Sequence, residues 1–97
     1  MNIINYYRDK IKKIILKEFS LEESDLKNIS FEFPRDSSLG DLSTNASMIL
    51  SGKLKKSPQE IASKIINLIE NNPDFENVEI AGKGFINIKL KKNVWWN

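Results

Sequence analysis

The chain has 97 residues, a length that supports one hydrophobic core and therefore one domain. Hydrophobic residues make up 40% of the chain, charged residues make up 29%, and the net charge is +2, so a nucleic-acid partner is permitted but not required. The chain contains no cysteine and no histidine, which excludes disulfides, thiolate nucleophiles, zinc-finger ligand sets and serine–histidine triads. We expect no catalytic residue and no metal site in this chain.

The N-terminus lacks the pattern of a signal peptide, since no basic head precedes an apolar run. No apolar stretch approaches the length that spans a membrane. We therefore expect a cytoplasmic domain with no membrane partner.

An amphipathic helix is expected over residues 2–18, where apolar side chains recur at helical spacing. Basic residues fill the positions between them, namely Arg8, Lys10, Lys12, Lys13 and Lys17. This basic set has two interpretations, a solvated helix face or an RNA contact.

The next segment is expected to hold about one helical turn at residues 21–28 and then a short strand. Ile29, Phe31 and Phe33 alternate with polar residues, and Pro34 ends the run because proline cannot donate to a sheet ladder.

A polar loop at residues 35–40 leads to a second expected helix, which begins at Leu42. Asp41 or Ser43 is expected to accept the free N–H groups at its start. The apolar positions of this helix are Leu42, Ala46, Ile49, Leu50 and Leu54.

A third helix is expected to start at Ser57 and to run to about residue 71. Ser57 at the N-cap, Pro58 at the first helical position and Glu60 three residues after the cap form the pattern of a capping box.

Two strands are expected at the C-terminal end, one around Val78 and Ile80 and one at residues 85–90, joined by a turn at residues 81–84. In the second strand, side chains alternate between two faces. Ile86, Ile88 and Leu90 share the face that suits a core, and the other face carries Phe85, Asn87 and Lys89.

The expected fold class is α+β, with an open, mainly antiparallel sheet of three to four strands and helices packed on one face. The expected order is α-β-α-α-β-β. We assign residues 1–92 to the domain, and residues 93–97 to the start of a linker or helix that leads to the rest of a longer chain.

The uncovered face of this sheet is the candidate binding surface. An aromatic ring such as Phe85 can stack on a base, an amide such as that of Asn87 can bond a base edge, and Lys89 can bind a phosphate. The alternative is structural: Phe85 belongs to the core, and Gly82-Lys83-Gly84 is only turn chemistry.

Three stretches together resemble the N-terminal additional domain of arginyl-tRNA synthetases. They are LGDLSTNA at residues 39–46, KKSPQEIA at residues 55–62 and VEIAGKGFIN at residues 78–87, which are similar to the family's GDxxTN, PxEIA and AGPGFIN runs. Each motif alone is weak, and their shared order and spacing over residues 30–90 make the resemblance specific.

The resemblance implies a domain appended to a class I catalytic core that contacts the D-loop corner of tRNA. Phe85 and Asn87 match the positions that face the D-loop nucleotide, with Gly82 beside them. Lys83 stands where the family usually has proline, which adds a charge and frees the turn. We interpret residues 40–41 and 44–45 as structural, a turn and a helix cap.

The resemblance also implies a parent enzyme that attaches arginine to tRNA using ATP. The signatures of a class I core, a histidine-rich motif and a KMSKS-like loop, are absent from this chain. We expect the 97 residues to have no catalytic activity and to bind no cofactor. Their expected partners are tRNA and the catalytic core of the parent chain.

Two other functions stay open from the residues alone. A free-standing RNA-binding domain is one, although Ile86 and Asn87 do not fit the aromatic strand signature of RNA-recognition motifs, and the spacing of Gly82 and Gly84 excludes a GxxG loop. A protein-interaction module that docks a partner through Phe85 and the terminal tryptophans is the other.

Overall fold

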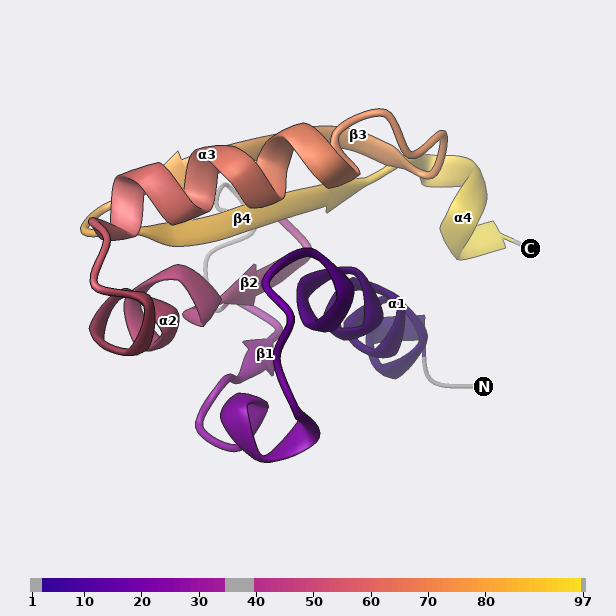
Figure 1. Ribbon diagram of the computed structural model, residues 1–97. Coiled ribbons are helices and arrows are strands. Elements are labelled where there is room, and N and C mark those ends of the chain that lie inside the picture. Colours follow the sequence, from indigo (N-terminus) through magenta and orange to yellow (C-terminus); the bar gives the residue numbers. More distant parts are fainter. Residues whose placement is uncertain (1–2, 35–39, 97) are drawn as a thin grey trace.

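The structure, a computed structural model, describes residues 3–34 and 40–96, so residues 35–39 of the expected polar loop at 35–40 lie outside the described residues (Figure 1). The side chains of Trp95 and Trp96 also lie outside the description. The elements in chain order are α1 (Ile3–Glu18), a 3₁₀ turn η1 (Glu23–Leu26), β1 (Phe31–Glu32), β2 (Leu42–Thr44), α2 (Ala46–Leu54), α3 (Pro58–Ile69), β3 (Phe75–Ala81), β4 (Phe85–Leu90) and α4 (Lys92–Trp96).

The four strands form one open sheet in the order β1-β2-β4-β3, and every neighbouring pair is antiparallel. Helices α1, α2 and α3 supply the apolar side chains that cover one face of this sheet (Figure 1). The predicted fold class, α+β with an open antiparallel sheet and helices on one face, is therefore confirmed.

The second helix does not begin at Leu42, as the sequence had predicted. Residues 42–44 form the strand β2 instead, in which Leu42 pairs with Ile88 and Thr44 with Ile86, and the helix α2 starts at Ala46. The strand conformation prevails because pairing with β4 places Leu42 and Thr44 on the face of the sheet that the helices cover, where both are buried. Asp41 and Ser43 do not cap α2, so that prediction was wrong. The helix cap expected at residues 44–45 is confirmed, since Asn45 occupies the N-cap position and Thr44 Oγ1 accepts the Ala46 N–H.

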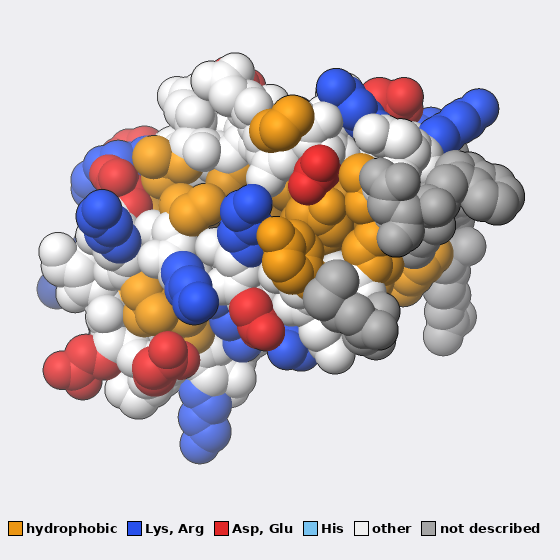
Figure 2. Space-filling model, turned by 90° about the vertical axis from the view of Figure 1, so that its right-hand side faces the viewer, with side chains coloured by type: hydrophobic (Ala, Val, Ile, Leu, Met, Phe, Trp, Pro, Cys, Tyr) orange, Lys and Arg blue, Asp and Glu red, His pale blue; other side chains and the backbone are white. Residues whose placement is uncertain are grey.

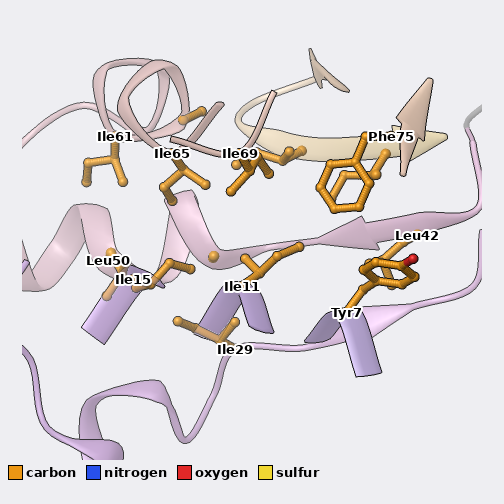
Figure 3. Close-up of a cluster of buried hydrophobic side chains, with 14 of the residues drawn as sticks. Tyr7, Ile11, Ile15, Ile29, Leu42, Leu50, Ile61, Ile65, Ile69 and Phe75 are labelled. Carbon is orange, nitrogen blue, oxygen red and sulfur yellow. The ribbon is translucent and has the colours of Figure 1, made fainter. Parts of the chain in front are cut away.

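The core lies between the sheet and the three long helices. Side chains from α3 face those from α1 and α2 across it, as Figure 3 shows for Ile61, Ile65 and Ile69 on one side and Ile11, Ile15 and Leu50 on the other. All six side chains are almost fully buried. The burial of apolar surface makes the largest favourable contribution to the folding free energy of a small domain.

The predicted capping box at the start of α3 has two hydrogen bonds, and the structure shows one of them. Ser57 Oγ accepts the N–H of Glu60 at 3.1 Å, and Pro58 occupies the first turn. The Glu60 carboxylate lies 3.7 Å from Lys56 Nζ. The serine cap is thus confirmed, and the Glu60 carboxylate forms an ion pair with Lys56.

Candidate nucleic-acid interface

The strand β4 alternates as its sequence predicts. Ile86, Ile88 and Leu90 are no more than 2% exposed, whereas Phe85 is 42% exposed. This phase turns Phe85, Asn87 and Lys89 toward the face of the sheet that the helices leave uncovered, which we call the open face. The interpretation of Phe85 as a core residue is therefore wrong.

All four strands contribute one residue to a single row across the open face. Glu32 of β1 pairs with Ser43 of β2, Ser43 pairs with Asn87 of β4, and Asn87 pairs with Glu79 of β3. The row places a hydroxyl and an amide in the middle of the sheet and a carboxylate at each end. Phe85 lies one pleat away on the same face, because residues two apart in a strand point in the same direction.

Asn87 lies on the predicted face but is only 5% exposed, so the prediction of an exposed side chain was wrong. The reason is its central position, with Ser43 and Glu79 in register on either side. Ser43 Oγ donates a hydrogen bond of 2.9 Å to Asn87 Oδ1. The amide is held by the sheet and presents only a small part of its surface to solvent.

The ring of Phe85 stands beside Gly82 in the turn between β3 and β4. A Cβ atom added at Gly82 would lie 4.0 Å from Phe85 Cδ2 and φ at Gly82 is +58°, so the backbone turns sharply next to the ring. Lys83 is exposed at negative φ, the sign that proline also requires. The proline expected here from the resemblance would require a backbone φ of the same sign as the lysine has.

The same turn is anchored to the start of α3. A Cβ atom at Gly84 would lie 2.7 Å from the Pro58 Cβ and 3.3 Å from the Met48 Cγ, so Gly84 packs directly against α2 and α3. Gln59 Nε2 donates to the Lys83 carbonyl at 3.5 Å. These contacts fix the backbone segment that precedes Phe85, and therefore the point from which its side chain leaves the sheet.

The charges around Phe85 and Asn87 are mixed. Lys89 Nζ lies 3.6 Å from the carboxylate of Glu76, and both side chains are about half exposed. Glu79 and Glu32 are exposed at the two ends of the row. Carboxylates beside the amide disfavour a phosphate there, and an uncharged base can approach them without repulsion.

The lysines of α1 do not join this surface. Lys10, Lys13 and Lys17 are exposed and lie with Tyr6 on one stripe of a helix that packs on the covered face of the sheet. Tyr6, Lys10 and Lys13, with Asp9, line a shallow open hollow of about 370 Å³. On the side of the molecule shown in Figure 2, basic and acidic side chains are interspersed around apolar ones, so the charge pattern resembles an ordinary solvated surface.

Sequence reasoning missed Ser43 as a member of the open face. It had placed Ser43 at the start of a helix, where its hydroxyl would have capped backbone N–H groups. The signal that identifies it is the pairing of LST at residues 42–44 with INI at residues 86–88, two short runs with matching alternation.

Among residues 3–34 and 40–96, no group of three His, Cys, Asp or Glu side chains is arranged to hold a metal ion. In the same part of the chain, no helix is long and apolar enough to cross a membrane.

A family model described as the arginyl tRNA synthetase N terminal domain matches residues 3–90. The chain belongs to this family. It is 48% identical over 99 residues to an arginine–tRNA ligase of Bartonella tribocorum and 41% identical over 99 residues to one of Brucella suis. Each match covers 98% of this chain and 17% of the relative, so the chain spans about a sixth of the length of these ligases.

A solved structure shares the fold. The arginyl-tRNA synthetase from Plasmodium falciparum superposes with a TM-score of 0.78 over 95% of this chain and 16% of its own, at 24% sequence identity. The domain resemblance inferred from the three motifs is thus confirmed.

Proposed function

We propose that this domain binds tRNA for an arginine–tRNA ligase and that the open face contacts the D-loop corner. The observation that carries the proposal is the exposed ring of Phe85 beside the held amide of Asn87, on a face that the helices leave uncovered. The family membership of residues 3–90 supports the choice of tRNA over other nucleic acids.

In this proposal Phe85 stacks on an unpaired base, an interaction worth about 1–3 kcal/mol per base in single-stranded recognition. Asn87 then bonds the edge of the stacked base, since it lies two residues along the same strand and faces the same side. Gly82 lies beside the ring, and Lys83 on the exposed turn meets the RNA backbone. An unstacked loop nucleotide satisfies these requirements, and a paired base within a helix does not.

The catalytic work belongs to the parent enzyme in this proposal. A class I core, joined to the domain in the same chain, attaches arginine to the tRNA with ATP, and it is the second partner of the domain. The domain itself binds no cofactor and works in the cytoplasm with its parent.

Nuclease protection of an arginine tRNA transcript tests the proposal. The chain is added at low salt, and the expected result is protection of D-loop nucleotides that weakens as salt rises from about 50 to 200 mM. A transcript whose D-loop is replaced by a short unrelated loop serves as the control and is expected to bind much more weakly. Equal affinity for the two transcripts, or protection confined to another part of the tRNA, would overturn the assignment. Salt-independent binding of a protein would favour an interaction module instead.

A further inference from the structure

Ser43 and Asn87 form a hydrogen bond across the middle of the open face. They are paired in register between β2 and β4, and Ser43 Oγ donates to Asn87 Oδ1 at 2.9 Å. Both strands are fixed from the other side of the sheet, because Leu42, Ile86 and Ile88 are fully buried in the core. Neither partner can move away without disturbing that packing.

The bond decides how the amide of Asn87 is oriented. An asparagine side chain ends in an acceptor oxygen and an NH₂ group with two donors, and a half-turn about its last torsion exchanges them. A serine hydroxyl can donate or accept, and in this structure it donates to Oδ1, so the oxygen of the amide faces β2. The Nδ2 group is the part of the amide that Ser43 does not engage, and we assign it to the ligand.

We propose that Ser43 is a positioning residue that makes Asn87 a hydrogen-bond donor to the bound base. This inference rests on the proposed function and deepens it, because it names what the base must offer. The base stacked on Phe85 presents a ring nitrogen or carbonyl acceptor to Asn87, and an edge that offers only an amino group is rejected. Ser43 itself does not touch the base.

Two substitutions and one matched control separate this role from a general effect on the fold. Ser43→Ala removes the donor and leaves the amide without a preferred orientation. Ser43→Thr keeps a hydroxyl and suits a strand. Ser51→Ala is the control, since Ser51 Oγ also makes one hydrogen bond, to the Lys56 carbonyl, at the far end of α2.

The first measurement uses RNA. Arginine tRNA transcripts carrying each of the four bases at each unpaired D-loop position are titrated against the four proteins. For Ser43→Ala, we expect the preference for the best base over the next to fall about fivefold, the equilibrium factor of one typical hydrogen bond. Ser43→Thr is expected to restore the preference and Ser51→Ala to leave it unchanged. An unchanged preference in Ser43→Ala would overturn the proposal.

The second measurement uses no RNA, so that failure of the proposed function can be told from failure of this inference. The Cβ atoms of directly opposed residues lie about 5 Å apart, so the strength of the nuclear Overhauser effect between the two side chains reports the amide orientation. In the wild-type chain, the effects from the Nδ2 protons of Asn87 to the Cβ protons of Ser43 are expected to be weak. In Ser43→Ala, the effects to the methyl protons at position 43 are expected to be stronger, since the amide turns over. If they strengthen and no transcript binds, the orientation is right and the RNA function is wrong. If they do not strengthen while transcripts bind with unaltered preference, the positioning role is wrong and the binding function stands.

Discussion

Gly84 and Pro58 lie so close that a Cβ atom at Gly84 would stand 2.7 Å from the Cβ of Pro58. Gly84 precedes Phe85 at the end of the β3–β4 turn, and Pro58 opens α3. Two of the three motifs that carry the family resemblance, at residues 55–62 and 78–87, therefore meet at this contact. The contact fixes the β3–β4 turn, and with it the start of β4, relative to α3.

Gly84→Ala is expected to destabilise the domain by about 1–3 kcal/mol, because the new methyl group overlaps Pro58 and φ at this position is +134°. Gly52→Ala is the matched control. Gly52 lies within α2 with open space around its Cβ position, so alanine there is expected to stabilise by about 0.5–1 kcal/mol. Urea denaturation midpoints of the two variants should move in opposite directions. Equal shifts would mean that Gly84 does not pack on Pro58.

Ser57→Ala is expected to lower the free energy of unfolding by about 1 kcal/mol, since it removes the acceptor of the Glu60 N–H at the start of α3. Ser57→Asp, which retains an N-cap acceptor, is expected to recover most of the loss. Thermal unfolding followed by circular dichroism measures both. If the two variants lost stability equally, the loss in Ser57→Ala would not come from the missing N-cap acceptor.

A buried phenol gives the fold a predictable dependence on pH. Tyr7 is 3% exposed, and its hydroxyl donates to Asp74 Oδ2 at 2.8 Å, which ties α1 to the loop before β3. Burial, together with the bond and charge of Asp74, raises the pKa of Tyr7 above its ordinary value of 10. The folded state therefore holds the proton more tightly than the unfolded state. Its contribution to stability is complete below pH 10 and declines as the pH rises beyond it.

Tyr7→Phe is expected to be less stable than the wild type by about 2 kcal/mol at neutral pH, because the part-buried carboxylate of Asp74 loses its partner. The difference should narrow above pH 10, since phenylalanine has no proton to lose. Urea titrations at pH 7 and at several points above pH 10 give the comparison. A difference that stays constant or widens at high pH would contradict the raised pKa.

What the sequence predicted well was encoded locally. The alternation of residues 85–90 needs only the sequence of one strand, and the Ser57 cap needs four consecutive residues. The strand β2 was missed because three residues carry too little pattern of their own. Their conformation is set by pairing with β4, more than 40 positions away.

Contacts between segments far apart in the sequence also determine the roles of two residues in the motif at residues 39–46. Asp41, predicted as a turn or cap residue, accepts the Leu90 N–H with Oδ2 at 2.8 Å and so continues the ladder between β2 and β4. Asn45 stands at the start of α2 but accepts the Ser30 N–H at 2.8 Å. Both bonds join segments that are far apart in the sequence, and the local sequence around Asp41 or Asn45 does not predict them. The burial of Asn87 was missed for the same reason, because Ser43 comes from β2.

Neighbouring substitutions in β4 test whether the open face binds tRNA while the other face supports the core. Affinity for an arginine tRNA transcript and the free energy of unfolding are measured for Phe85→Ala and Ile86→Ala. Phe85→Ala is expected to weaken binding by about 1–3 kcal/mol and to stay folded. Ile86→Ala is predicted to lose about 2–5 kcal/mol of stability as a cavity opens in the core. A Phe85→Ala variant that binds the transcript as tightly as the wild type while remaining folded would contradict the assignment of the open face.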